Sequence, residues 1–194
     1  MIKFKVVVAG AKNVGKTSLI RRYATGKFEK STLSTIGVDF ETKKVLVDDT
    51  EILLNIWDFA GEKKFRLLFP SYVSGASGAL MLYDITNEDS LKDLHDWINV
   101  ISSVPNSPKT KILIEAKTDL KRNVKRENGL SLFNKYKFQG ELLGTSSKTG
   151  ENVEKAFEML GREILKNSLK KCANCGKHYP LELKFCQYCG TKTK

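Results

Sequence analysis

The chain has 194 residues, of which 41% are hydrophobic, and a formal net charge of +11 at pH 7. This length suits one medium domain or one domain with a small appendage, and the apolar content excludes general disorder. Residues 166–194 hold seven lysines and one glutamate. Such a basic end favours nucleic acid, acidic proteins or anionic lipid as partners, although a solvated tail that only aids solubility explains it equally well.

The sequence lacks the patterns of membrane-spanning and secreted proteins. No apolar run approaches the ~18 residues of a membrane span, and the apolar stretch at residues 6–11 is too short for the core of a signal peptide. Position 2 is not glycine and the last residue is not cysteine, so no myristoylation or prenylation is expected. All four cysteines lie between Cys172 and Cys189, which argues against a disulfide-stapled fold. We therefore expect a cytoplasmic protein.

Predicted strands and helices alternate along the chain. Residues 2–9 are β-branched and apolar and predict a buried strand, and residues 16–25 carry a helical pattern. Two alternating segments, 38–47 and 51–57, flank Asp48-Asp49 and predict a hairpin. The other predicted elements are strands at 78–83, 111–116 and 142–143, and helices at 87–104, 127–137 and 151–169. This order predicts a three-layer α/β domain with a mostly parallel sheet.

Residues 10–17, Gly-Ala-Lys-Asn-Val-Gly-Lys-Thr, match the pattern G-x-x-x-x-G-K-[ST] between a predicted strand and a predicted helix. The glycines let the backbone wrap around phosphate oxygens, and the helix N-terminus favours their negative charge. Lys16 can reach the terminal phosphates, and the Thr17 hydroxyl can ligate Mg²⁺. The predicted phosphate site comprises Lys12, Asn13, Val14, Gly15, Lys16, Thr17 and Ser18.

Two further segments carry residues that suit the same site. Asp58 ends a predicted strand and can hold Mg²⁺ through a water molecule, and the N–H of Gly61 can meet a γ-phosphate. Thr35, in the loop-like stretch 31–37, is a candidate second hydroxyl ligand to the metal. Alone, Asp58 or Thr35 is better interpreted as a strand-end or turn residue. Together with the phosphate loop they predict one nucleotide and magnesium site.

Two later segments predict a base site. Residues 117–119, Lys-Thr-Asp, follow a predicted strand, and the Asp119 carboxylate can accept two hydrogen bonds from guanine N1 and N2. Adenine would leave this carboxylate without those donors, which costs several kcal/mol. The segment 145–148 follows the last short strand and can offer a backbone N–H to guanine O6. Each tripeptide is common on surfaces, but their order predicts a guanine site of Lys117, Asp119, Ser146, Ser147 and Lys148.

These motifs resemble those of the Ras superfamily of small GTPases over residues 3–168. The resemblance is closest to the Rab branch, at residues 34–40, Ser-Thr-Ile-Gly-Val-Asp-Phe, and at residues 83–86, Tyr-Asp-Ile-Thr. It implies a P-loop GTPase fold with a six-stranded, mostly parallel sheet, binding of GTP, GDP and Mg²⁺, and slow hydrolysis. It also implies two switch segments, at about 28–39 and 59–75, that reorder when the γ-phosphate is lost. By the same resemblance Phe28 lies against the guanine. The protein is expected to be a monomer, with effector, exchange-factor and activating proteins as partners.

The sequence departs from the family pattern at four positions. Glu62 stands where the family has a water-positioning Gln, so the carboxylate either impairs hydrolysis or acts as a base. Ala116 replaces the Asn of N-K-x-D, whose amide steadies the base and the phosphate loop, and Phe59 places an aromatic ring in the second switch. Lys12 either blocks an inserted arginine from an activating protein or supplies part of its charge. The implied catalytic residues are Lys16, Gly61 and Glu62.

Two C-x-x-C-G segments, 172–176 and 186–190, occupy the C-terminal end. Four thiolates suit a tetrahedral Zn²⁺ site, and a glycine after each pair permits a turn that aims N–H groups at sulfur. The segment resembles a zinc ribbon with a short spacer, with His178 as a spacer residue. The alternatives are two disulfides, which the expected cytosolic context disfavours, and a redox pair, a motif that normally lies in its own thioredoxin-like domain. The predicted Zn²⁺ ligands are Cys172, Cys175, Cys186 and Cys189, and the metal would supply folding energy that ~20 residues cannot.

The sequence therefore predicts a Rab-like GTPase domain at 1–168 and a zinc ribbon at 169–194, connected only through the end of a helix. The first functional hypothesis is a GTP-dependent switch with slow hydrolysis, in which the ribbon replaces a lipid anchor as a docking module. The alternative is a hydrolysis-deficient GTP-binding adaptor whose ribbon binds protein or nucleic acid. In either case the basic tail can contact anionic membrane or nucleic acid, and eukaryote-like switches with a ribbon for a tail suggest an archaeal origin.

Overall fold

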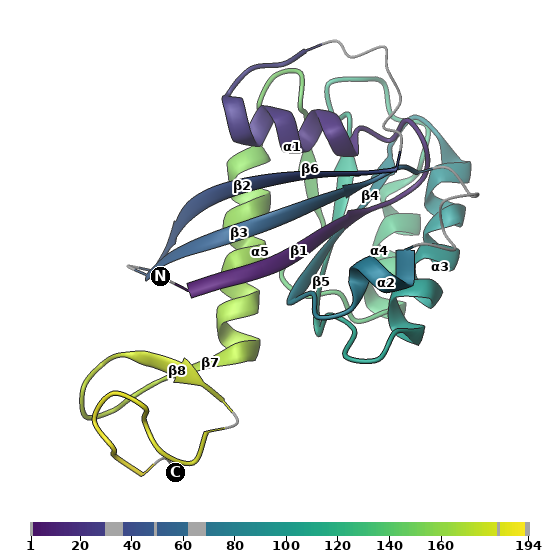
Figure 1. The fold of residues 1–194 in the computed structure, drawn as a ribbon. Coiled ribbons are helices and arrows are strands. Elements are labelled where there is room, and N and C mark those ends of the chain that lie inside the picture. The colour runs from purple at the N-terminus through teal and green to yellow at the C-terminus, as the bar shows by residue number, and fades with distance from the viewer. Residues whose placement is uncertain (1, 30–36, 49, 62–68, 182, 193–194) are drawn as a thin grey trace.

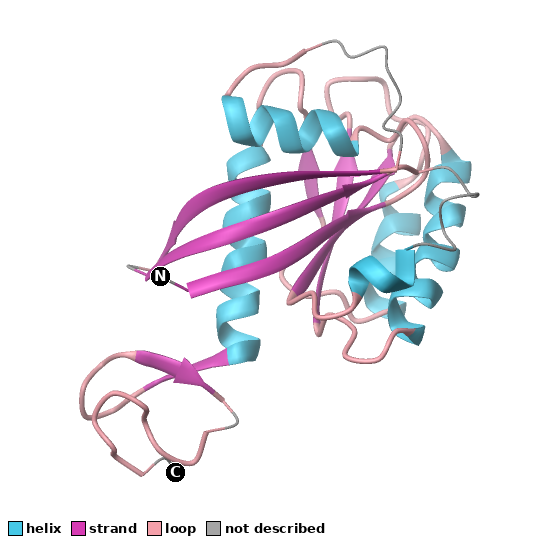
Figure 2. Cartoon of the chain, in the orientation of Figure 1, coloured by secondary structure: helices cyan, strands magenta, loops and turns pink. Residues whose placement is uncertain are grey.

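The computed structural model describes residues 2–29, 37–48, 50–61, 69–181 and 183–192. Thr35 and Glu62 of the predicted site lie outside these residues. A six-stranded sheet with strand order β2-β3-β1-β4-β5-β6 runs through the domain, with helices on both faces (Figures 1 and 2). Strand β2 is antiparallel to β3, and the other neighbouring strands are parallel. The fold predicted from the sequence is confirmed.

The strands of this sheet are β1 (Ile2–Ala9), β2 (Val38–Val47), β3 (Thr50–Phe59), β4 (Gly78–Asp84), β5 (Thr110–Ala116) and β6 (Leu143–Thr145). The helices are α1 (Lys16–Thr25), α2 (Phe69–Val73), α3 (Glu88–Ser103), α4 (Arg126–Lys135) and α5 (Val153–Ser168). The sequence pattern did not predict α2, because five residues are too few to display a helical period.

The two faces of the sheet pack against different helices. On one face Val6 and Val8 of β1 join the core formed with α1 and α5, where the rings of Tyr23 and Phe157 stack at 3.8 Å. On the other face Val7 belongs to the core formed with α2, α3 and α4. Because successive side chains of a strand point to opposite faces, a strand buried on both sides reads as a continuous apolar run.

The parallel strands all end at the same edge of the sheet, and the predicted site residues follow those ends. The phosphate loop follows β1, Asp58 lies near the end of β3, and the segments 117–119 and 146–148 follow β5 and β6. Ligands of open α/β sheets bind at this edge. The topology therefore gathers residues that are up to 136 positions apart in the sequence, Lys12 and Lys148.

A separate two-stranded sheet follows α5 directly and consists of β7 (Leu169–Lys171) and β8 (His178–Pro180) (Figure 1). The Nδ1 atom of His178 lies 3.4 Å from the Thr50 hydroxyl at the start of β3. A cavity of about 210 Å³ lies between this small sheet, α5 and the β2–β3 turn. The small sheet therefore meets the rest of the protein at Thr50 as well as at the end of α5, which was the only point of contact expected from the sequence. Within the described part of the chain, no helix is long and apolar enough to cross a membrane.

Candidate functional site

The loop between β1 and α1 has the backbone conformation that its glycines permit. Gly10 has a φ of 147° and Gly15 a φ of 101°, and Asn13 between them lies in the left-handed region with a φ of 64°. A Cβ atom at Gly10 would clash with the carbonyl oxygen of Leu82 on β4. The loop is therefore closely packed on the sheet and leads directly into the N-terminus of α1, where N–H groups favour anions.

The Lys16 side chain folds back over this loop. Its Nζ donates hydrogen bonds to the carbonyl oxygens of Gly10 at 2.9 Å and of Ala11 at 2.8 Å. Burial lowers the pKa of Lys16 to about 8, against the opposite effect of the Asp58 and Asp93 charges. A bound phosphate would favour the ammonium form, so the position of Lys16 fits a cation that meets phosphate oxygens.

Two oxygen atoms suited to Mg²⁺ meet beside Lys16. The Thr17 hydroxyl at the start of α1 donates a 2.5 Å hydrogen bond to Asp58 Oδ2 at the end of β3, and the Asp58 side chain is buried. A hydroxyl and a carboxylate are hard donors of the kind that Mg²⁺ prefers. These two residues therefore fit the metal that the sequence predicts there.

Gly61 lies against the phosphate loop. A Cβ atom at Gly61 would come within 2.5 Å of the backbone of Ala11 and Lys12, so only glycine allows this approach. Next to it, the N–H of Ala60 donates to the carbonyl oxygen of Gly37 at 3.0 Å. This bond joins the end of β3 to the residue that precedes β2.

A cavity of about 440 Å³ connects the phosphate loop with the predicted base site. The loop and the first turn of α1 supply one side, and the segments after β5 and β6 supply the other. The half-exposed Phe28 ring also lines it. Predicted site residues among those lining the cavity are Val14, Gly15, Ser18, Phe28, Lys117, Asp119, Ser147 and Lys148.

The Asp119 carboxylate is oriented by a neighbouring loop. The hydroxyl of the buried Ser146 donates a 2.6 Å hydrogen bond to Asp119 Oδ1 and accepts one of 3.1 Å from the N–H of Thr149. The N–H of Thr118 donates to the carbonyl oxygen of Thr145 at 3.1 Å. The two segments of the predicted base site are thus bonded to each other through both backbone and side chains.

Lys117 is held in a left-handed conformation, with a φ of 67°. Its Nζ pairs with Asp84 Oδ2 at 2.6 Å, and the other Asp84 oxygen accepts hydrogen bonds from the N–H and hydroxyl of Thr86. Asp84 ends β4 and was not among the predicted site residues. A charged residue at the carboxyl end of an otherwise apolar strand was the available signal for it.

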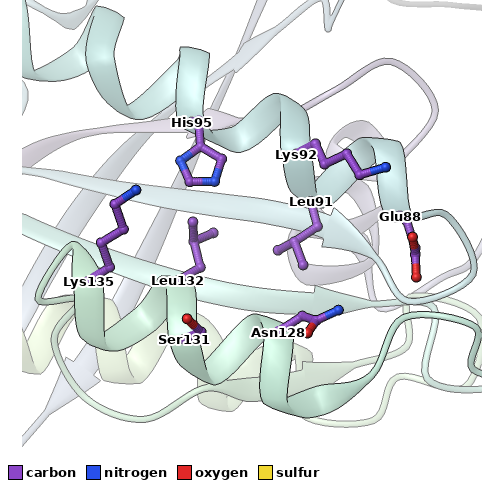
Figure 3. A pocket seen from close by; sticks show the side chains of 8 residues that line it. All are labelled: Glu88, Leu91, Lys92, His95, Asn128, Ser131, Leu132 and Lys135. Carbon is purple, nitrogen blue, oxygen red and sulfur yellow. The ribbon is translucent and has the colours of Figure 1, made fainter.

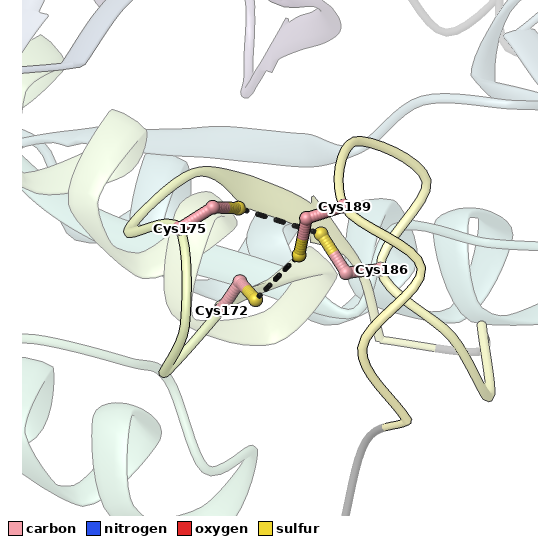
Figure 4. Close-up of side chains that lie close together, drawn as sticks. All are labelled: Cys172, Cys175, Cys186 and Cys189. Carbon is pink, nitrogen blue, oxygen red and sulfur yellow. Dashed lines mark hydrogen bonds between the residues drawn. The ribbon is translucent and has the colours of Figure 1, made fainter.

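The four cysteine sulfur atoms form a compact cluster (Figure 4). Sγ–Sγ distances are 3.6 Å for Cys172 and Cys189 and 3.7 Å for Cys175 and Cys186, and all four Sγ atoms lie within 4.8 Å of one another. No disulfide joins these cysteines. Four sulfur atoms at the ~2.3 Å Zn–S distance of a tetrahedral site would lie about 3.8 Å apart, so the cluster fits Zn²⁺.

The two knuckles repeat one backbone pattern. The N–H of Gly176 donates to the Cys172 carbonyl oxygen and that of Gly190 to the Cys186 carbonyl oxygen, both at 2.9 Å. Both glycines have a φ near 70°. Hydrogen bonds from the Thr191 hydroxyl and then from its backbone lower the pKa of the Cys189 thiol to about 6. Against the lowering effect of a hydrogen bond from the Lys177 backbone, burial and hydrogen bonds to the other three cysteines raise the pKa of the Cys175 thiol to about 11.

Another cavity, of about 360 Å³, lies between α3 and α4 (Figure 3). Leu91 and Leu132 line its apolar part, and His95 Nδ1 lies 2.8 Å from the Tyr136 hydroxyl beside it. Lys92 and Lys135 stand at its rim. The residues that line it include none of those predicted for the nucleotide site.

Comparison with known proteins places the chain in a family. The model of the Ras family matches residues 5–166. Ras-related protein Rab-13 of Canis lupus familiaris is 34% identical over 186 residues, which cover 94% of this chain and 91% of that protein. Ras-related protein Rab-8B of Homo sapiens is 38% identical over 164 residues, 84% of this chain and 78% of that protein. Ras-related protein RABA5c of Arabidopsis thaliana is 38% identical over 174 residues, 88% of this chain and 80% of that protein.

The phosphate loop, the strand order and these similarities together define a small GTPase. The chain belongs to the Ras family, and within the Ras superfamily it is Rab-like. It is accordingly an enzyme that binds and hydrolyses GTP. The structure brings Lys16, Thr17, Asp58 and Gly61 together around the phosphate loop and Lys117 and Asp119 to the far side of the cavity. The roles of the individual residues stay predictions.

Proposed function

We propose that the protein is a GTP-dependent molecular switch, which alternates between GTP-bound and GDP-bound forms and slowly hydrolyses GTP to GDP and phosphate. The observation that carries this proposal is the single cavity that has Gly15 and Ser18 on one side and Lys117 and Asp119 on the other. A nucleotide lying along it would have its phosphates at the N-terminus of α1 and its base at Asp119.

Selection of guanine is assigned to Asp119. The Ser146 hydroxyl orients its carboxylate, and the cavity wall beyond it is formed by Ser147 and Lys148, whose backbone N–H groups suit guanine O6. Adenine would bring an acceptor towards the carboxylate, and the desolvated charge would then lose its hydrogen-bond donors. The half-exposed ring of Phe28 is available to cover the base.

Magnesium binding is assigned to Thr17 and Thr35 directly and to Asp58 through water. When bound, Mg²⁺ neutralises charge on the β- and γ-phosphate oxygens. Thr35 belongs to a segment outside the described residues, next to Gly37, whose carbonyl oxygen is bonded to the N–H of Ala60. A γ-phosphate that interacts with Thr35 and Gly61 would therefore act on the segment before β2 and on the segment after β3, at the same end of this antiparallel pair.

Hydrolysis requires an oxygen of water to bond to the γ-phosphorus while the bond to the β–γ bridging oxygen breaks. In our proposal Lys16 and the Gly61 N–H stabilise charge on the transferred phosphoryl group. The Glu62 carboxylate accepts a hydrogen bond from the attacking water but has no donor for the γ-phosphate, and its charge opposes that of the phosphate. Because a glutamine amide would donate to the γ-phosphate and carries no charge, we expect the carboxylate at this position to give slow turnover.

The ribbon is proposed as the docking module that takes the place of a lipid anchor. In this proposal residues 1–168 are the GTPase domain, and residues 169–194 bind Zn²⁺ through Cys172, Cys175, Cys186 and Cys189. A four-cysteine site leaves no open metal position for water, so its role is structural. The protein would act in the cytoplasm as a monomer, with effector, exchange-factor and activating proteins as partners.

A second candidate is a hydrolysis-deficient adaptor whose ribbon is the working part. The ribbon exposes 54% of Phe185 and 52% of Tyr188 in a lysine-rich segment, which suits contact with protein or nucleic acid. Ala116 and Glu62 are the departures that would weaken the nucleotide cycle. The two candidates differ in the rate at which bound GTP is cleaved.

Single-turnover hydrolysis separates them. Protein loaded with GTP would be mixed with Mg²⁺, and free phosphate and the bound nucleotide would be followed over hours. A switch releases phosphate slowly and only with Mg²⁺, and Thr17→Asn slows this release. Retention of intact GTP throughout would favour the adaptor.

Removal of residues 172–194 tests the ribbon. We expect guanine-nucleotide affinity to stay within a few-fold of the full chain, because no ribbon residue that the structure describes lines the cavity. Partner or membrane association, measured by co-sedimentation, should be lost. A collapse of nucleotide binding would instead mean that the contact between His178 and Thr50 supports the domain itself.

A further inference from the structure

The side chain of Glu115 is a buried charge close to the predicted base site, and none of the roles assigned above uses it. It lies on β5, directly before Ala116, with 0% of the residue exposed. Burying a carboxylate without partners costs several kcal/mol, and an apolar residue at this position would avoid that cost. The groups that satisfy the Glu115 carboxylate therefore indicate a role for this charge at the carboxyl end of β5.

Three donors from three different segments satisfy the Glu115 carboxylate. Oε1 accepts a 2.6 Å hydrogen bond from the Tyr83 hydroxyl on β4 and a 2.7 Å bond from Arg122 Nη1. Oε2 accepts a bond from Arg126 Nη1 on α4. The carboxylate thus links β4, the segment after residues 117–119 (here called the base loop), and the first turn of α4.

The arginines extend the network beyond the carboxylate. Arg126 Nη2 donates to the carbonyl oxygen of Leu142 at 2.8 Å, just before β6, and Arg122 Nη1 also donates to that of Val124 at 3.2 Å. Burial and the bond to Glu115 raise the pKa of the Tyr83 hydroxyl, which keeps it a donor. The network is accordingly made of charge-assisted bonds, which are stronger than neutral ones.

The base loop is held between two members of this network. Asp119 lies four residues after Glu115 and three residues before Arg122. Between them Lys117 has a left-handed φ of 67°, a conformation that a non-glycine residue keeps only when surrounding structure imposes it. The ion pair of Glu115 with Arg122 closes this segment at its base.

We propose that Glu115 is a positioning residue for guanine recognition, which through Arg122 and Arg126 fixes the base loop that carries Asp119. This inference rests on the proposed function of the cavity as a guanine-nucleotide site. Ala116, next in the chain, offers only a methyl group where an asparagine amide would steady the loop. The network holds the same loop in another way: ionic bonds from Glu115 to the two arginines take the place of the asparagine amide, which would bond towards the phosphate loop.

The test compares Glu115→Gln with a matched control, Leu113→Ala. Leu113 lies two residues earlier on the same strand, is fully buried and belongs to the same core cluster as Tyr83, but its side chain has no polar atom that could bond to either arginine. Both variants lower thermal stability, and only the first removes the charge that holds the arginines. The readouts are the dissociation rate of GDP and the affinity ratio of GDP to IDP, whose base lacks the 2-amino group that Asp119 reads.

We expect Glu115→Gln to release GDP about tenfold faster, which corresponds to ~1.4 kcal/mol, and to reduce the GDP-to-IDP ratio. Leu113→Ala should keep both quantities within about twofold of the wild type, as expected when the loss of three core carbon atoms only lowers stability. Arg126→Gln, which leaves the Arg122 pair intact, should give a smaller effect in the same direction and serves if Glu115→Gln does not fold.

Equal effects of Glu115→Gln and Leu113→Ala, or a wild-type GDP-to-IDP ratio in both Glu115→Gln and Arg126→Gln, would overturn the proposal. Failure of the proposed function has a different signature. In that case the wild-type protein itself would show no preference for GDP over IDP or ATP, before any variant is considered.

Discussion

The Ser146 hydroxyl donates a 2.6 Å hydrogen bond to the carboxylate of Asp119, and the two residues come from loops that follow neighbouring parallel strands. The hydroxyl occupies one side of the carboxylate and fixes its plane. Both loops open onto the cavity that reaches the phosphate loop. The predicted base site and the phosphate loop therefore lie at the same edge of one sheet.

Asp119→Asn should shift the preference from guanosine to xanthosine nucleotides. Xanthine has a carbonyl where guanine has its 2-amino group, and an amide can donate to that carbonyl where a carboxylate cannot. We expect GDP affinity to fall by at least tenfold and XDP affinity to rise, as for other sites that read a polar edge. Competitive displacement of a fluorescent GDP analogue measures both. An unchanged GDP-to-XDP ratio would remove Asp119 from base recognition.

Thr35→Ala should separate the two nucleotide states. In our proposal Thr35 meets Mg²⁺ only when a γ-phosphate orders its segment, so GDP affinity should remain nearly unchanged. Affinity for a non-hydrolysable GTP analogue should fall, and titration of each nucleotide by calorimetry gives the two values. Thr17→Asn is the comparison variant, because Thr17 is bonded to Asp58 at the proposed metal site and its loss should weaken Mg²⁺-dependent binding more broadly. Equal losses for both nucleotides in Thr35→Ala would contradict the switch.

Glu62→Gln tests the role of the carboxylate in hydrolysis. If Glu62 is a poor substitute for an amide, glutamine should speed single-turnover hydrolysis, because it donates to the phosphate as well as accepting from water. If Glu62 acts as a base, glutamine should slow hydrolysis and flatten its pH profile. The single-turnover rate in the two proteins across pH 5–9 distinguishes these outcomes. An identical rate throughout would show that Glu62 takes no part.

Zinc should bind at about one ion per chain, as a four-cysteine site of this geometry requires. Elemental analysis of protein purified without chelator gives the stoichiometry. The double variant Cys172→Ser, Cys175→Ser should lose the metal and, because the ribbon depends on it, the protection of residues 169–192 against proteolysis. His178→Ala is the matched control within the ribbon and should keep its zinc. Zinc far below one per chain, or unchanged in the double variant, would exclude the site.

The main elements of the fold could be predicted from apolar runs and helical periods in the sequence. The buried strands β1, β4 and β5 each contain a continuous apolar run, at residues 6–9, 78–83 and 112–114, and the period of α3 and α5 is unambiguous. Short elements lack a period, so α2 and the β7–β8 hairpin could not be predicted in this way. The contact between His178 and Thr50 joins residues 128 positions apart and has no local signal.

The candidate site was predictable where a motif carries the chemistry, as at Lys16, Thr17 and Asp119. Its supporting residues were not, because their importance arises only from tertiary contacts. A charge near the end of a largely apolar strand is the local signal at Asp84 and Glu115, but their partners, Lys117 and two arginines, are given only by the structure. Thr35 and Glu62 lie outside the described residues, so their roles stay predictions, from the sequence context for Thr35 and from the resemblance for Glu62.

The measurement that tests the central claim most directly is competition between GTP and ATP for the wild-type protein in the presence of Mg²⁺. Protein loaded with a fluorescent GDP analogue would be titrated with each nucleotide, and the nucleotide that co-purifies with the protein would be identified in parallel. Recognition of guanine by Asp119 predicts that GTP displaces the analogue stoichiometrically, that a guanine nucleotide co-purifies, and that ATP fails at concentrations about a thousandfold higher. Displacement by ATP as effective as that by GTP would contradict the assignment of this cavity to a guanine-nucleotide switch.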